Sequence, residues 1–151
     1  IHTPGHTPGS TSYLIDNKFL ISGDTLFIMS VGRPDLGGKV DEWAVMLFNT
    51  LKTKIDRLDP GTHILPGHYM DWKEANKDQI FSDTLSGIKK RNQGIYEIEK
   101  EEDFVDFIKK NMRQQPEVYA RIRKVNAGLL QVGEDEQEIM DLGKNECAAS
   151  G

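Results

Sequence analysis

The chain of 151 residues has the length of one domain, and its content of 37% apolar and 28% charged residues is that of a globular protein. A net charge of −5 gives no bulk attraction for nucleic acid or for an anionic membrane, so we expect neither as a partner. The longest unbroken apolar run, residues 43–48, is far shorter than the roughly 20 residues of a membrane span. The single cysteine, Cys147, excludes an internal disulfide, and no signal segment is visible, so we expect a cytoplasmic location.

Residues 1–70 are predicted to form short strands joined by Pro/Gly turns. Three apolar runs are predicted as buried strands: residues 11–15, 19–22 and 63–65. Asn17-Lys18 is the predicted hairpin turn between the first two runs. Residues 41–58 are apolar along one helical face, and a helix is therefore predicted there, capped by Asp41 and stopped by Pro60.

The second part of the chain is predicted to be mainly helical. The expected helices cover residues 82–90, residues 101–112, and a stretch from Pro116 to just before Gly133. Residues 134–151 are predicted to be a polar, partly disordered tail that links to a further domain. Strands followed by helices, with one strand–helix–strand crossover, predict an α/β fold for residues 1–133.

Three turns carry residues suited to metal chemistry. His6 stands between two Pro-Gly pairs, Asp24 follows the apolar strand that ends at Ser22, and His68 follows the strand of residues 63–65. Side chains at strand ends can meet at one edge of a sheet, so we expect these three to cluster. Two imidazoles and a carboxylate suit Zn, Fe or Mn better than a metal that prefers thiolates.

The sequence motifs around these residues resemble those of a known family. GHTPGS (His6), SGDTLF (Asp24) and LPGHY (His68) resemble the third, fourth and fifth metal-binding motifs of the metallo-β-lactamase fold hydrolases, in the same order. The resemblance implies that residues 1–133 are the C-terminal half of a four-layer αβ/βα sandwich. The family's HxHxDH motif, which precedes GHT, is absent, and the chain opens at Ile1 inside a motif. We therefore expect a fragment of a longer chain, whose N-terminal half supplies the remaining metal ligands.

Further residues narrow the choice within the superfamily. The stretch VGRPDLGG, with Arg33, resembles the GRxD segment of the persulfide dioxygenases, whereas the related thioester hydrolase glyoxalase II has a lysine at that position. Arg33 is thus a candidate to bind a substrate carboxylate, and the alternative is a loop pair between Arg33 and Asp35. Tyr69 matches a glyoxalase II tyrosine that reaches the substrate; a role as a wall residue is the alternative.

The resemblance implies a persulfide dioxygenase in which His6, Asp24 and an upstream histidine hold one Fe(II), while His68 orients ligands or water from outside the metal's ligand set. Such an enzyme converts a low-molecular-weight thiol persulfide and O₂ to sulfite and the thiol. The alternative is a zinc-dependent, glyoxalase II-like thioester hydrolase, in which His68 is a direct ligand. Asp24 is the predicted catalytic residue in both. A non-catalytic fragment or docking module is the alternative from another class, and a rhodanese domain and a second copy are the candidate protein partners.

The remaining histidines and the cysteine are expected to lie outside this chemistry. Pro4-Gly5 breaks any helix that would align His2 with His6, and His63 lies inside a predicted strand, so both are predicted to be structural. Cys147 lies in the polar tail without an evident activating neighbour, and we expect an inert, exposed thiol.

Overall fold

The computed structural model describes residues 1–116, 118–141 and 149, and it has the α/β character predicted from the sequence. The strands of its sheet are β1 (Tyr13–Ile15), β2 (Phe19–Gly23), β3 (His63–Pro66) and β4 (Asp83–Thr84). The α-helices of the described part are α1 (Val40–Thr53), α2 (Leu85–Arg91), α3 (Gln93–Tyr96), α4 (Glu101–Asn111), α5 (Val118–Asn126) and α6 (Glu134–Asp141). Two short 3₁₀ helices, η1 (Ile55–Arg57) and η2 (Trp72–Glu74), complete the set. None of the helices described is long and apolar enough to cross a membrane.

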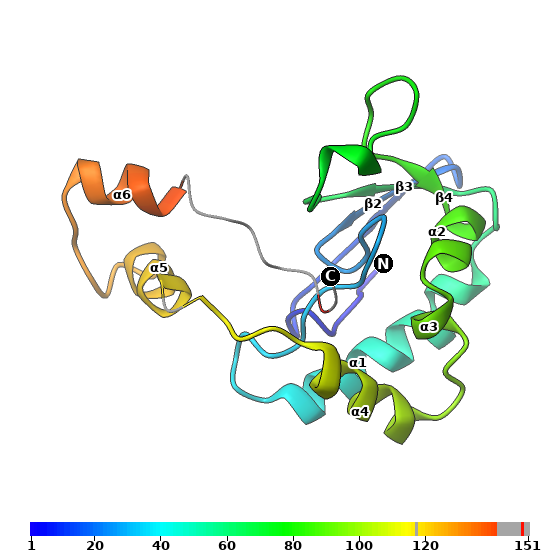
Figure 1. Cartoon of the computed structure of the whole chain (residues 1–151), viewed down its shortest axis with the longest axis horizontal. Coiled ribbons are helices and arrows are strands. Elements are labelled where there is room, and N and C mark those ends of the chain that lie inside the picture. The colour runs from blue at the N-terminus through cyan, green and yellow to red at the C-terminus, as the bar shows by residue number, and fades with distance from the viewer. Residues whose placement is uncertain (117, 142–148, 150–151) are drawn as a thin grey trace. The chain divides into compact units, whose positions relative to one another are not determined.

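The strands are arranged in chain order, β1-β2-β3-β4, and Figure 1 shows them beside the helices. The pairs β1–β2 and β3–β4 are antiparallel, while β2 and β3 are parallel and are connected through α1. Leu20 of β2 lies opposite Ile64 of β3. Because parallel strands end at the same edge of a sheet, the turns that follow β2 and β3 meet there.

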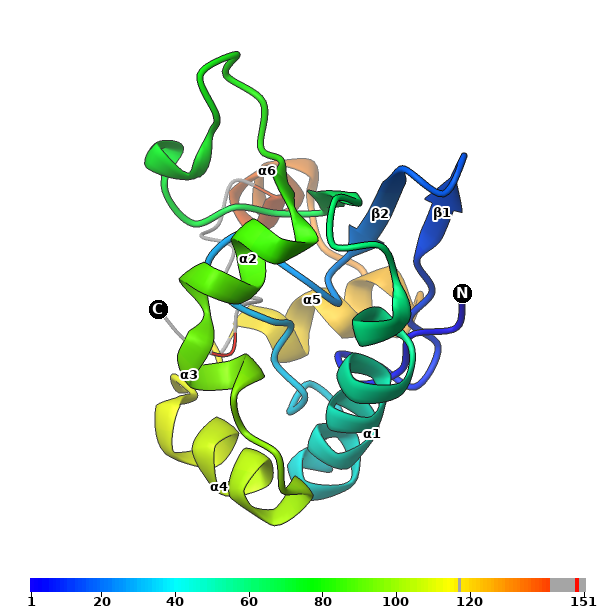
Figure 2. The same ribbon diagram turned by 90° about the vertical axis from the view of Figure 1, so that its right-hand side faces the viewer.

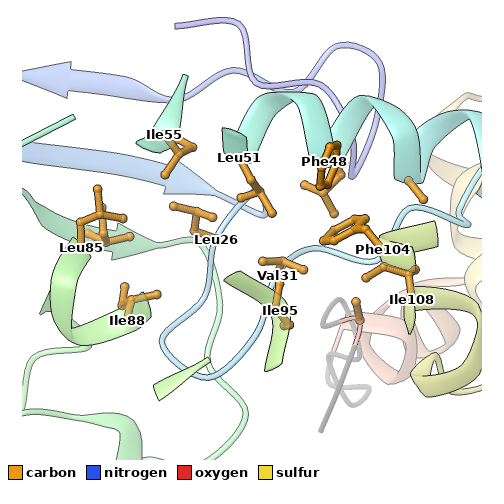
Figure 3. Packing of buried hydrophobic residues seen from close by; sticks show 14 of the residues in the cluster. Leu26, Val31, Phe48, Leu51, Ile55, Leu85, Ile88, Ile95, Phe104 and Ile108 are labelled. Carbon is orange, nitrogen blue, oxygen red and sulfur yellow. The ribbon is translucent and has the colours of Figure 1, made fainter. Parts of the chain in front are cut away.

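One face of the sheet packs into the hydrophobic core. Leu20 and Ile64 are fully buried under α1, α2 and α4. Figure 3 shows side chains from these elements interleaving, with the ring of Phe48 on α1 against that of Phe104 on α4 at 5.5 Å between centroids. The two helices run side by side, as Figure 2 shows, and Asn49 Nδ2 donates a hydrogen bond to Glu101 Oε2.

The opposite face of the sheet is apolar but open. Tyr13, Ile15, Phe19 and Ile21 share this face, and their exposed fractions lie between 42% and 64%. The prediction of fully buried strands is therefore wrong for β1 and β2. An apolar run shows that both faces suit a nonpolar environment, but it does not show that both are covered within the chain.

The hairpin turn and the end of the first helix differ from the prediction. The hairpin turns at Asp16 and Asn17, which have φ values of 51° and 53°, rather than at Asn17-Lys18. Both central positions require left-handed backbone, which Asp and Asn tolerate better than Lys. The helix predicted over residues 41–58 ends at Thr53 and is followed by η1; the Thr53 hydroxyl bonds to the Asn49 carbonyl, a contact that disturbs helix continuation.

The described residues form two compact units. One contains residues 1–113 with Ala149, and the other lies within residues 114–146. In the second unit, α5 ends before Gly128, whose φ of 69° closes the helix, so the predicted end near Gly133 is wrong. The first eight residues of the predicted polar tail form α6. The domain boundary predicted at residue 133 stays a prediction, and Cys147 lies outside the described residues.

Candidate metal site

The structure brings His6, Asp24 and His68 together at the edge where β2 and β3 end. His68 Nδ1 lies 2.6 Å from Asp24 Oδ1, and His6 Nε2 lies 3.4 Å from Asp24 Oδ2. Each carboxylate oxygen thus faces a different imidazole. The three turns therefore converge as the sequence predicts, and Asp24 is the central group.

His6 is fixed from two sides. Its side chain is almost completely buried, and Nδ1 donates a 2.9 Å hydrogen bond to the carbonyl oxygen of Arg33. Because Nδ1 carries the proton of this bond, Nε2 is the nitrogen that faces Asp24, and it would bind a metal after giving up its own proton. The loop that carries His6 lies against α1, because the Thr50 hydroxyl donates to the Pro4 carbonyl at 2.6 Å. Gly5 is required there, since a Cβ would stand 2.6 Å from the Leu47 Cα.

Two glycines allow the backbone to approach Asp24 closely. A Cβ on Gly32 would lie 1.8 Å from the Asp24 carbonyl oxygen and 2.9 Å from the His6 Cβ. A Cβ on Gly67 would lie 2.8 Å from Asp24 Oδ1. The sequence analysis did not assign either glycine to the site. Gly32 directly precedes Arg33, and Gly67 directly precedes His68, both of which are candidate site residues from the sequence. These positions are the signal that could have identified the two glycines.

The electrostatics favour an ionised carboxylate. Burial would raise the pKa of the Asp24 carboxyl, but the hydrogen bond from His6 and the charge of His68 outweigh it, so the pKa lies below its ordinary value. An ionised carboxylate beside an imidazole nitrogen fits the donor set of Zn or Fe. In the part of the chain that the structure describes, no group of three or more His, Cys, Asp and Glu side chains is arranged to hold a metal by itself. That the chain presents part of a metal site stays a prediction.

Arg33 is fully buried, and its guanidinium is engaged inside the protein. Nε and one terminal nitrogen donate to the two oxygens of Asp35, at 2.7 and 2.9 Å, and the same terminal nitrogen donates to the Arg113 carbonyl at 2.6 Å. This is the loop pair that the sequence analysis named as the alternative. A substrate role for Arg33 stays a prediction, whereas its backbone carbonyl already positions His6.

Tyr69 belongs to an aromatic cluster beside the site. Its ring stacks on Phe81 with 3.7 Å between centroids and 7° between planes, and Trp72 meets both rings edge-on. The sequence analysis missed Trp72 and Phe81, because no local pattern shows that a loop folds back on itself. A separate open depression of about 360 Å³ is lined by His6, Asp24 and small polar residues of the turns that carry them. The substrate role of Tyr69 stays a prediction.

His2 and His63 make other contacts. His2 Nε2 lies 2.7 Å from the Pro8 carbonyl oxygen, and the His63 ring lies 5.8 Å from that of Phe19 on the open face of the sheet. Both contacts agree with the structural roles predicted for these two histidines.

Comparison with known proteins links this geometry to one superfamily. No protein-family model matches the chain. A probable metallo-hydrolase of Bacillus subtilis, YqgX, is 42% identical over 69 residues, which are 45% of this chain and 31% of that protein. The probable polyketide biosynthesis zinc-dependent hydrolase BaeB of Bacillus velezensis is 30% identical over 108 residues, 71% of this chain and 42% of that protein. The chain thus spans less than half the length of these curated relatives.

Two solved structures have a similar fold. A metallo-β-lactamase from Staphylococcus aureus superposes with a TM-score of 0.70 at 29% identity, covering 89% of this chain and 41% of that one. ETHE1 from Myxococcus xanthus superposes with a TM-score of 0.62 at 24% identity, covering 86% of this chain and 53% of that one, and it supports the fold alone. Together with the converging GHTPGS, SGDTLF and LPGHY turns, these likenesses show that the chain belongs to the metallo-β-lactamase superfamily.

Proposed function

We propose that this chain forms part of a metal-dependent enzyme that acts at the sulfur of a small thiol compound, and that the reaction is the oxidation of a thiol persulfide to sulfite and thiol by O₂. The observation that carries the proposal is that the two carboxylate oxygens of Asp24 face different imidazoles. Oδ2 faces His6 Nε2, where one metal would be held, while Oδ1 is hydrogen-bonded to His68. This arrangement suits a single metal with His68 as an orienting neighbour.

The residues of this chain would supply two ligands and their support. Nε2 of His6 and Oδ2 of Asp24 would bind Fe(II), together with a histidine from outside these 151 residues. When bound, iron supplies the site at which O₂ and the persulfide sulfur are brought together. The Arg33 carbonyl holds His6 in one orientation, and His68 holds the Asp24 carboxylate. The VGRPDLGG segment, similar to the persulfide dioxygenases, supports this choice of reaction.

Hydrolysis of a thioester is the second candidate; the names of two relatives favour it, and the geometry of Asp24 is also compatible with it. The two oxygens of Asp24 point to two different imidazoles, as a carboxylate that bridges two zinc ions would. His68 would then be a ligand, and the bound metals would supply an activated water for attack on the thioester carbonyl. YqgX and BaeB are both named as hydrolases.

The open sheet face supports a larger assembly around this chain. Four large apolar side chains on β1 and β2 are more than 40% exposed. A patch of this kind is rare on a finished monomer surface. In our proposal, the rest of the metallo-β-lactamase domain covers it and brings the missing metal ligands. A non-catalytic docking module would also need a partner to cover this sheet face, but it would not need a metal.

The test uses the full-length protein that contains this chain. We expect it to purify with close to one iron per site, to consume O₂ with glutathione persulfide, and to leave a glutathione thioester intact. Asp24→Ala should lose most of the metal, while Asp103→Ala, on the exposed side of α4, should keep it. Zinc at two per site with thioester hydrolysis would establish the second candidate. Full metal retention in Asp24→Ala would overturn both.

A further inference from the structure

The loop between β3 and β4 displays an apolar cluster. We call residues 69–81 the aromatic loop; Figures 1 and 2 show it projecting from the sheet. Tyr69 and Phe81 are stacked in it, and Trp72 packs edge-on against the stack although 61% of its surface is exposed. Met70 and Ile80 are also exposed, at 42% and 52%. Five large apolar side chains thus gather on one short surface loop.

The shape of this loop is set by its polar residues. One oxygen of Glu74 accepts hydrogen bonds from the backbone N–H groups of Met70 and Asp71, at 2.9 and 3.0 Å. The side chain of Asn76 accepts the N–H of Ile80 at 3.1 Å. These carboxylate and amide oxygens fix the loop, which exposes Met70, Trp72 and Ile80 alongside charged residues such as Lys73 and Lys77. The exposed rings are displayed on a preorganised support, which lowers the entropic cost of binding a ligand.

The aromatic loop begins at the candidate metal site. Tyr69 directly follows His68, and adjacent Cα atoms are about 3.8 Å apart. His68 in turn is hydrogen-bonded to Asp24. A small molecule whose sulfur lies at Asp24 therefore has the start of the apolar cluster within reach. Pockets for small molecules typically combine such an apolar wall with a few polar groups that fix the reacting end.

We propose that the exposed face of Met70, Trp72 and Ile80, backed by the Tyr69–Phe81 stack, binds an alkyl or acyl chain carried by the thiol substrate. The inference rests on the proposed function, since it places the substrate's sulfur at Asp24. It refines the substrate class: among thiol compounds, those that carry a longer apolar group are bound more tightly. Continuity with the metal site favours a substrate group here over a second copy of the chain.

The experiment measures binding without turnover, so it is independent of which reaction the metal supports. N-acetylcysteamine S-ethyl, S-butyl and S-hexyl thioethers, which cannot be hydrolysed as thioesters, are titrated into the full-length protein by calorimetry. We expect Kd to fall about threefold to fourfold for each added methylene, the effect of burying a CH₂ group. In a Trp43→Phe background, Trp72 is the sole tryptophan of this chain, and its fluorescence should shift with the hexyl probe.

Variants locate the effect. Trp72→Ala, at a largely exposed position, should fold normally by circular dichroism and lose most of the chain-length dependence of Kd. Leu129→Ala, at an even more exposed apolar position in the second unit, should bind as the wild type does. Equal Kd values for all three probes in the wild type, or an unchanged dependence in Trp72→Ala, would overturn the proposal. The proposal would also be overturned if the protein formed a dimer that Trp72→Ala dissociates and bound none of the probes. Loss of catalysis with intact probe binding would instead count against the proposed function.

Discussion

The two imidazoles that meet at Asp24 are held in different ways. His6 lies in a buried cradle, which we define as Val31–Arg33 with the loop of residues 3–10; its side chain is 8% exposed. His68 directly precedes the aromatic loop, and its side chain is 43% exposed. One imidazole is therefore fixed before any metal arrives, while the other has room to turn. The difference fits a division in which His6 defines the metal position and His68 adjusts the carboxylate.

The two supports also have different origins. The cradle depends on contacts between residues far apart in the chain, such as that between Arg33 and the Arg113 carbonyl. The aromatic loop depends on hydrogen bonds between near neighbours, such as those accepted by Glu74. Damage to the cradle should therefore spread into the core, whereas changes in the loop should stay local.

The largest effect is expected from filling the cradle. Gly32→Ala places a methyl group 1.8 Å from the Asp24 carbonyl oxygen, so the backbone must move. We expect a loss of about 3 kcal/mol or more in the free energy of unfolding, at the upper end of overpacking effects, together with loss of metal. Urea denaturation and elemental analysis measure the two. Gly9→Ala is the matched control, because a Cβ there meets nothing within 4 Å. Equal stability of the two variants would show that the cradle is not rigid.

A smaller loss of stability is expected when the arginine of the cradle is replaced by lysine. Arg33→Lys keeps the charge but cannot form both bonds to Asp35 and the bond to the Arg113 carbonyl. We expect a loss of about 2 kcal/mol in the free energy of unfolding, because Asp35, whose side chain is only 15% exposed, is left poorly paired. Arg121→Lys, in the exposed pair with Glu136, should cost less than about 0.5 kcal/mol.

The same variant separates two roles for Arg33. If the side chain contacts substrate, as the VGRPDLGG resemblance implies, Arg33→Lys will keep its stability and raise KM. If it supports the cradle, stability and metal affinity will fall together. A stable variant with full metal content and a raised KM would contradict the structural role.

Much of the site was predictable because its signals are local. His6, Asp24 and His68 each stand in a short turn containing Gly or Pro, and the parallel pairing of β2 and β3 then brings Asp24 and His68 to one edge. The helix over residues 101–112 was predictable for a similar reason, since its apolar side chains recur at helical spacing and α4 covers residues 101–111.

The features that could not be predicted from the sequence depend on contacts with other parts of the fold. The strand β4 has two residues, Asp83 and Thr84, and no periodicity to detect. The alternation in β2 could not reveal that Leu20 is buried while Phe19 and Ile21 are open, because both faces are apolar. The Arg33 contact with Arg113 joins residues 80 positions apart, and only the packed fold brings them together.

The two imidazoles should differ in their effect on the metal-free protein. His6→Ala removes a buried ring and leaves the Arg33 carbonyl without its partner, so we expect a loss of about 1–3 kcal/mol in the free energy of unfolding. His68→Ala removes an exposed ring, and we expect less than about 1 kcal/mol. Denaturation in the presence of a chelator measures both. A His68 variant as unstable as the His6 variant would show that the aromatic loop is part of the cradle.

The smallest expected effect is a pH dependence centred on Asp24, where the two supports meet. Burial would raise the pKa of this carboxyl, but the hydrogen bond from His6 and the charge of His68 bring it below its ordinary value. The ionised form thus favours folding above the ordinary carboxyl pKa of about 4, and this contribution is lost as the pH falls toward the lowered pKa of the folded state. Asp24→Asn lacks a group that titrates here. With metal removed, the unfolding free energy of the wild type should therefore decline relative to that of Asp24→Asn as the pH drops from about 6 to about 3. A difference that stays constant or widens in favour of the wild type over this range would show that the two imidazoles do not stabilise the carboxylate.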